Sequence, residues 1–542
     1  MQWMQVYDPL GNAAASTAVA AIPIRVLLGC IASGRVKAHY AALLALATAF
    51  LVATTVVGMP IGAATSATLL GAGYGLLPIC WIVLNILFLY QLTAEQGAFD
   101  RMKVSIASLS SDRCIQLVLI AFALGSFFEG TAGFGTPVAI TGAILLGLGF
   151  TPLQASGLSL IANTAPVAFG AMGSPIFALQ SVTGIDAMLL SKMIGRQLPI
   201  FSIIIPFWLI AAYDGWRGVR RTWPVLLVAG VSFAVPQFLM SNYHGPSLVD
   251  VVSSVICVGS VAMFVRLTRR DDGHALPGAE AELAPAQSPD ASTATWAPWV
   301  ILCVLVFLWG LPQSKGWLNS VYAPQIHVPG LDGMVFRVPP VVPTPTAEAA
   351  IFTFNILSAT GTSILLAAIL GGLLLRYSLA DMMRVYGRTL HIAWRSLLTI
   401  TAMLAVAFLT RYSGLDAILG LAFARTGFFY PMFGTLLGWL GVALTGSDTS
   451  SNVLFGSLQK ITATQLGLSP VLMAAANSTG GVMGKMVDAQ SIVVASTATK
   501  ATGMEGAILR FVFLHSVALA LLVGVLVMLQ AYVAPFTSMV PR

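Results

Sequence analysis

Two acidic residues, Glu129 and Asp448, interrupt stretches of the sequence that are otherwise apolar. Placing a carboxylate in the middle of a membrane costs about 2.5–3.5 kcal/mol on translocon-insertion scales, so such residues usually face a cavity or a pathway. Loss of solvation also disfavours the charged form of a carboxyl group, which lets the group hold a proton near neutral pH. We therefore consider Glu129 and Asp448 candidates for proton coupling.

Each acid belongs to a polar, glycine-rich interruption, and a second interruption follows about one helix later. The four segments are SFFEGTAGFGTP (126–137), NTAP (163–166), LTGSDTSSN (444–452) and NSTGG (477–481). The spacing is 30 residues from Gly133 to Asn163 and 29 from Asp448 to Asn477. Backbone that leaves helical geometry at membrane depth must be satisfied by protein or by a water-filled cavity. Paired breaks in two halves of a chain therefore predict a transporter site.

Such breaks suit a small anion. The N-terminus of a half-helix presents free N–H groups and the positive end of the helix dipole, and Asn, Ser and Thr side chains add donors. We expect the substrate to be bound by the following residues: Gly133, Gly135, Asn163, Thr164, Ser447, Thr449, Ser450, Asn477, Ser478, Thr479 and Lys485. The alternative for any single motif is that small residues simply let helices pack closely in lipid.

Two of these residues keep alternative roles. Asp448 stands beside Ser447 and Thr449 at an expected helix start, where it would also serve as a cap. Lys485 would pair with a substrate carboxylate or with one of the two acids, or would extend to a membrane interface.

The elements that position these residues follow from composition. Of the 542 residues, 57% are hydrophobic and 9% are charged, whereas soluble domains carry about 25% charged residues. This excludes a soluble enzyme, a nucleic-acid-binding protein and a disordered regulator. Since a spanning helix needs about 20 residues, the apolar runs predict about 12–14 transmembrane helices. We expect an all-α polytopic membrane protein with two inverted repeats and re-entrant or broken helices.

Residues 271–295 are polar and rich in Ala, Pro and Glu, which predicts a flexible cytoplasmic linker between a half at 1–270 and a half at 296–542. Clusters of Lys and Arg mark the cytoplasmic loops by the positive-inside rule. That rule places the N-terminus outside, in the periplasm, and makes the proline-rich stretch 313–350 an external loop.

Catalytic motifs do not occur in the sequence. It has no HExxH, GxSxG or Walker A motif, and its six histidines are scattered. We expect neither an enzyme nor a sensor, and we expect no metal, no cofactor and no nucleic-acid partner.

The chain resembles the bacterial L-lactate permease family along essentially its whole length. The matching strings are YDPLGN (7–12), EGTAGFGTPVAI (129–140), NTAPVAFGAMGSPI (163–176), DGWRG (214–218), SATGT (358–362), GWLGVALTGSDTSSN (438–452), NSTGGVMGKM (477–486) and LQAYV (529–533). One departure follows Lys485: this chain reads VDAQS (487–491) where the family pattern has a Ser-Pro, so Asp488 adds a charge there.

The resemblance implies a symporter in the bacterial cytoplasmic (inner) membrane that moves L-lactate, and related 2-hydroxymonocarboxylates such as glycolate, together with protons. It also implies two re-entrant hairpins with tips at Asn163-Thr164 and Asn477-Ser478-Thr479, and alternating access. A homodimer is a further expectation. Two other functions stay open, a sodium-coupled carboxylate transporter and an anion channel.

Overall fold

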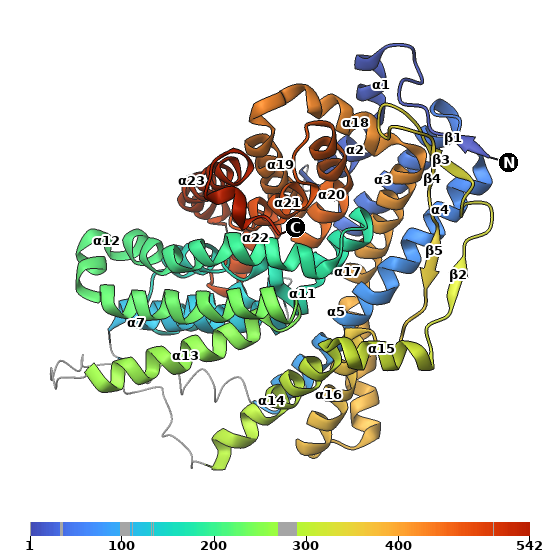
Figure 1. Cartoon of the computed structure of the whole chain (residues 1–542). Coiled ribbons are helices and arrows are strands. Elements are labelled where there is room, and N and C mark those ends of the chain that lie inside the picture. The colour runs from blue at the N-terminus through green and yellow to red at the C-terminus, as the bar shows by residue number, and fades with distance from the viewer. Residues whose placement is uncertain are drawn as a thin grey trace.

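The computed structural model describes residues 2–32, 36–97, 109–110, 112–131, 133, 135–268, 290–501 and 503–541. It is built almost entirely of helices, and small strands lie at one end (Figure 1). The expected all-α polytopic fold is confirmed.

The helical segments of the first half are α1 (Ala13–Ala20), α2 (Ile22–Ala32), α3 (Ala38–Leu51), η1 (Val52–Val56), α4 (Ile61–Tyr74), η2 (Gly75–Cys80), α5 (Trp81–Glu95), α7 (Arg113–Leu117), η3 (Val118–Leu124), α8 (Gly125–Thr131), α9 (Thr136–Gly147), α10 (Pro152–Ala162), η4 (Val167–Phe169), α11 (Gly170–Thr183), α12 (Ala187–Tyr243) and α13 (Val249–Thr268). The second half contains α14 (Asp290–Gly310), α15 (Pro312–Val321), α16 (Thr360–Leu374), α17 (Leu379–Ser413), α18 (Leu415–Phe423), η5 (Ala424–Phe429), α19 (Tyr430–Thr445), α20 (Asp448–Gln465), α21 (Pro470–Gly484), α22 (Ala489–Ala498), α23 (Glu505–Tyr532) and η6 (Phe536–Met539).

Within the described residues, 9 helices are long and apolar enough to cross a membrane, or up to 11 if each of two bent pairs counts as one span. The longest, α12, reverses direction at Gly215, whose backbone leaves helical geometry. Its two arms then lie side by side, since Ser202 donates to Gln237 and Arg196 donates to Asn242. Counting the arms separately brings the larger total to twelve, at the lower end of the expected range.

Buried apolar side chains form two large clusters. One draws mainly on α7–α13 and α19–α23, together with α5, α14, α16 and the first part of α17, and the other draws on α1–α4, the later part of α17 and α18. Helices α11 and α20, which contact each other, contribute to both clusters and therefore lie at their boundary. Each cluster includes residues from both halves of the sequence, so the halves interlock. The division into repeats at 1–270 and 296–542 stays a prediction.

The stretch 313–350, expected to be an external loop, contains secondary structure of its own. After α15 come β2 (Gln325–His327), β3 (Val335–Arg337), β4 (Thr346–Ala347) and β5 (Ile351–Thr353). Strand β3 lies between the N-terminal strand β1 (Trp3–Met4) and β4, and β2 pairs with β5. The pairing of β1 with β3 places the N-terminus and this stretch on one side of the molecule, as the expected topology requires.

The expected linker is partly corrected. Residues 271–289 lie outside the described residues, but α14 begins at Asp290, so the last six residues of the expected range 271–295 are helical. The apolar run that follows, with Pro298 tolerated inside the helix, extends helical structure back across the boundary that composition suggested.

Glu348 anchors the strands to α17. Its carboxylate pairs with Arg337 of β3 at 2.7 Å and with Arg411 of α17 at 2.9 Å. Burial alone would raise the pKa of Glu348, but the attraction of Arg411 and Arg337 outweighs it and lowers the pKa below its usual value. These two ion pairs therefore stabilise the fold at pH values above the ordinary pKa of a glutamate. The contribution is lost as the pH falls through the lowered pKa of Glu348.

We expect Glu348→Gln to lower the free energy of unfolding by about 1–3 kcal/mol at neutral pH, since two partly buried guanidinium groups lose their partner. The difference from the unmodified protein should shrink as the buffer is made acidic. Thermal unfolding midpoints in detergent, measured across a pH series, test this. The matched control is Asp381→Asn, which removes an exposed pair with Arg384 and should change the midpoint little. A pH-independent difference would contradict the assignment.

Candidate functional site

Four helix interruptions meet near the boundary of the two clusters. They separate α8 from α9, α10 from α11, α19 from α20, and α21 from α22. The first three coincide with the predicted segments 126–137, 163–166 and 444–452. The fourth lies at Lys485–Asp488, beyond the predicted segment 477–481.

Glycines permit the first interruption, since Gly133 and Gly135 have φ of +57° and +84°, where side chains with a Cβ are strained. In the second interruption Asn163 ends α10. Ala171 and Met172 there adopt positive φ of 43° and 57°, a conformation that costs energy for residues other than glycine and is typical of functional sites. Regular helix in α11 therefore starts near Ser174.

The two interruptions of the second half end in capped helices. Gly446, with φ of +73°, ends α19, and the Ser447 hydroxyl accepts a hydrogen bond from the Ser450 backbone at 3.3 Å to cap α20. Asp488 caps α22 by accepting from the Ser491 N–H at 2.7 Å. The half-helix α20 thus begins with an acid, Asp448.

The expected break at 477–481 is wrong, because Asn477, Ser478 and Thr479 lie inside the continuous helix α21. Neighbouring side chains satisfy their polar groups: Asn477 donates to Asn452 at 3.0 Å and accepts from Gln459 at 3.2 Å. A helix whose polar side chains are bonded to adjacent helices has no need to unwind. The re-entrant tip expected at these residues is corrected accordingly.

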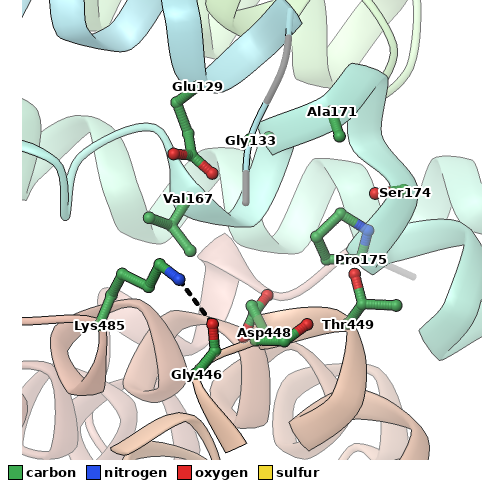
Figure 2. Close-up of a pocket in the computed structure, with 12 residues that line it drawn as sticks. Glu129, Gly133, Val167, Ala171, Ser174, Pro175, Gly446, Asp448, Thr449 and Lys485 are labelled. Carbon is green, nitrogen blue, oxygen red and sulfur yellow. Dashed lines mark hydrogen bonds between the residues drawn. The ribbon is translucent and has the colours of Figure 1, made fainter. Parts of the chain in front are cut away.

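The interruptions enclose a cavity of about 40 Å³ (Figure 2). A water molecule needs roughly 10–15 Å³ of such space, so the cavity accepts a few waters or a small ligand. Its lining residues are Glu129, Gly133, Val167, Gly170, Ala171, Ser174, Pro175, Gly446, Ser447, Asp448, Thr449 and Lys485.

Three charged side chains face this cavity, and each is at least 95% buried: Glu129 from α8, Asp448 from α20 and Lys485 from the end of α21. In Figure 2 the Glu129 carboxyl points into the cavity from one half of the sequence, whereas Asp448 and Lys485 come from the other. The site is therefore assembled from both halves.

The three charged groups differ in their partners. Glu129 accepts one hydrogen bond from the Asn163 amide at 3.2 Å. Asp448 accepts from Ser478 at 2.5 Å and from Asn452 at 3.2 Å. Lys485 donates to the Gly446 carbonyl at 2.5 Å and pairs with Asp488 at 3.6 Å. Both acids are therefore held at one oxygen, Glu129 by one donor and Asp448 by two, and the second oxygen of Asp448 has no partner among the described residues.

The predicted site residues fall into three groups. Glu129, Gly133, Ser447, Asp448, Thr449 and Lys485 line the cavity. Two more do not line the cavity but bond the acids that do: Asn163 donates to Glu129, and Ser478 donates to Asp448. The remaining residues have other contacts: Gly135 faces Val494, the Thr164 hydroxyl donates to Ile161, the Ser450 N–H donates to Ser447, Asn477 bonds within α20 and α21, and Thr479 donates to Gln197.

The sequence did not lead us to expect that the start of α11 lines the cavity. Ser174 and Pro175 follow the positive-φ turn at Ala171–Gly173 and bring a second half-helix N-terminus to the cavity, opposite that of α20. The string FGAMGSP carries the signal, since a Pro in the first turn of a helix marks its start. Two N-termini and one ammonium make this a place for an anion, and the two acids make it a place for protons.

Metal ligation has no comparable support. Across the part of the chain that the structure describes, no three His, Cys, Asp or Glu side chains gather in a way that could hold a metal ion.

Comparisons with known proteins show which family the chain is similar to. The family model described as L-lactate permease matches residues 16–534. The glycolate permease GlcA of Escherichia coli K12 is 43% identical over 99% of this chain and 99% of its own length. The L-lactate permease of the same strain is 43% identical over 99% of this chain and 100% of its own. Among solved structures, the Neisseria gonorrhoeae efflux pump MtrF has a TM-score of 0.47 and 12% identity, covering 86% of this chain and 83% of its own.

The different surroundings of two asparagines lead to a stability prediction. Asn477→Ala removes a fully buried amide and leaves polar partners on α20 unsatisfied, so we expect the free energy of unfolding to fall by about 1–3 kcal/mol. Asn163→Ala removes a single donated bond, together with an amide oxygen that lacks a partner among the described residues, and should destabilise less. Thermal unfolding of both purified variants in detergent compares them, and an equal or reversed order would contradict the assignment.

Proposed function

The chain belongs to the L-lactate permease family and is a multi-pass membrane protein, and on that basis we propose that it imports L-lactate and glycolate by proton symport. The names of its relatives describe permeases, which are transporters and not enzymes. We further propose that it lies in the bacterial inner membrane with its N-terminus in the periplasm, and the distribution of Lys and Arg supports that orientation.

The charge composition of the cavity is the observation that carries the proposal. Two acids and one lysine line it, and Asp488 lies directly behind the lysine. With all of these groups ionised, the site would repel a carboxylate, since two like charges 4 Å apart interact by about 4 kcal/mol at an effective dielectric of 20. A proton on Glu129 removes one negative charge. Anion binding and protonation of Glu129 therefore favour each other.

Energetics of import also favour this coupling. Lactate is an anion at neutral pH, because an unperturbed carboxyl has a pKa of about 4. Bringing one negative charge inside against a 100 mV inside-negative potential costs about 2.3 kcal/mol, roughly a 40-fold penalty on accumulation. One proton carried with each lactate cancels that charge and lets a pH gradient drive uptake.

The binding groups follow from the cavity. In our proposal the N-termini of α11 and α20, with Ser174 and Thr449, hold the carboxylate and the 2-hydroxyl group, and Lys485 supplies positive charge. Lys485 already bonds the Gly446 carbonyl, a backbone carbonyl at a helix break of the kind that sodium sites use. The protein thus provides its own cation there, which favours protons over sodium as the coupling ion.

Alternating access requires one group of helices to move against another. The cavity lies beside α11 and α20, at the boundary between the two apolar clusters. We propose that the body formed by α7–α13 and α19–α23 moves relative to the body formed by α1–α4 and α17, and so exposes the site to each side in turn.

Glu129→Gln tests the proton carrier. With the outside one pH unit more acidic and no potential, one coupled proton per lactate supports a roughly tenfold accumulation in proteoliposomes. Because the amide cannot carry a proton, the variant should approach no accumulation. Uptake of radiolabelled L-lactate, with sodium replaced by choline, measures this. Accumulation by the unmodified protein that depends on sodium and not on pH would contradict the proposal, as would unchanged coupling in the variant.

Gly170→Ala tests the position of the Glu129 carboxyl. A Cβ at Gly170 would lie 2.6 Å from Glu129 Oε1, so the flexible carboxyl must leave its place, whereas Gly170 has an ordinary negative φ. We expect lactate uptake to fall by at least about tenfold, the equivalent of one lost hydrogen bond to a charged group. Gly147→Ala is the matched control, because open space surrounds that position. Equal uptake by the two variants would exclude the assigned geometry.

A further inference from the structure

A further buried acid lies beside α8, the helix that carries Glu129. Asp250 is the second residue of α13 and is 1% exposed. Neither of its carboxyl oxygens has a hydrogen-bond partner among the residues that the structure describes. The sequence motifs did not single it out, and it does not line the cavity.

Its neighbour is the helix that carries Glu129. A Cβ added to Gly130 would lie 2.7 Å from the Cβ of Asp250, so α8 and α13 come into backbone contact at this point. Glu129 precedes that glycine, and the two carboxyl groups are close enough to interact electrostatically. The glycine is what allows the two acids to approach.

Among the residues with a described structure, the helices around Asp250 bring no compensating positive charge to it. Helix α13 packs against α8, η3, α11 and α12. Glu129 is the ionisable residue of α8, and η3 and α11 have none. The second arm of α12 carries its ionisable groups near its ends, at Arg217, Arg220, Arg221 and Tyr243. His244 follows that arm, and its ring stacks on Phe307 and bonds the Phe307 carbonyl.

A purely structural role would be stabilisation of the first turn of α13 by a negative charge. The helix dipole offers a carboxylate at that position only a small gain, which is less than the cost of burying the charge without a partner beside a second carboxyl. The un-ionised acid avoids that cost. A buried carboxyl that keeps its proton next to a proton-coupling residue can act as a proton donor.

We propose that Asp250 is a second proton-binding site, which exchanges its proton with Glu129. This inference rests on the proposed function. In the exchange, the O–H bond of Asp250 breaks and an O–H bond on a Glu129 oxygen forms, so that Glu129 becomes neutral and the negative charge moves to Asp250, away from the substrate. The donation from Asn163 favours ionised Glu129 before this step.

One experiment is spectroscopic and needs no transport. Infrared difference spectra of the purified protein at neutral pH, taken between the unmodified protein and Asp250→Asn, should show loss of the carbonyl band of an un-ionised carboxylic acid. Asp250→Glu should shift that band. If Asp250→Asn does not fold, the shift of the carbonyl band in Asp250→Glu is the test. Spectra in which this band is neither lost nor shifted overturn the proposal.

The second experiment measures coupling in proteoliposomes. We compare initial uptake driven by a pH gradient with lactate counterflow, which needs no net proton movement. Asp250→Asn should lower the ratio of the two rates by at least about tenfold, and Asp250→Glu should restore most of it. Asp416→Asn is the control, because its buried carboxyl is bonded to Ser457 and to the Ala417 N–H, away from the cavity.

The outcomes separate the two proposals. If the unmodified protein shows no proton movement with lactate, the proposed function fails. If it moves protons but Asp250→Asn has the same rate ratio as the unmodified protein, only the role of Asp250 is overturned.

Discussion

Free backbone groups at the ends of interrupted helices are the constraint on which the site depends. At membrane depth these groups must find partners within the protein or in enclosed water. Here they gather around one cavity, where the N-termini of α11 and α20 and the Gly446 carbonyl lie together. The protein partly satisfies them itself, through the Lys485 ammonium on that carbonyl and through the caps made by Ser447 and Asp488. The first turn of a helix leaves N–H groups without partners inside the helix, and such groups are suited to a carboxylate.

The same constraint explains why the site lies at the boundary of the two apolar clusters. An interruption buried in one close-packed cluster would have to be satisfied fully by fixed partners. Helices α11 and α20 instead contribute side chains to both clusters, and the cavity forms where the two meet. Because a boundary between two packed bodies is also where one can slide against the other, the binding and the movement that we propose are linked in one place.

How much of this could be predicted from the sequence depends on the kind of signal. The all-helical membrane fold, the interruptions at 126–137, 163–166 and 444–452, and the two acids follow from composition and from polar residues in apolar runs. Asn477 was placed wrongly, because a polar string inside a helix looks the same whether it unwinds or bonds to its neighbours. Asp250 was missed, since an Asp before an apolar run reads as an ordinary helix start. Strands β2–β5 are too short to leave a periodic pattern.

The two halves place their acids differently with respect to the interruptions. Glu129 stands before its interruption, in α8, where no helix N-terminus compensates its charge, and Asn163 bonds one of its oxygens. Asp448 stands after its interruption, in the first turn of α20, and accepts from Ser478 and Asn452. A charge held by a helix N-terminus and two donors costs less to keep than one with a single donor and other acids nearby. We therefore propose different roles for the two acids: Asp448 holds the start of α20 in place, and Glu129 is the group whose protonation changes as the anion enters.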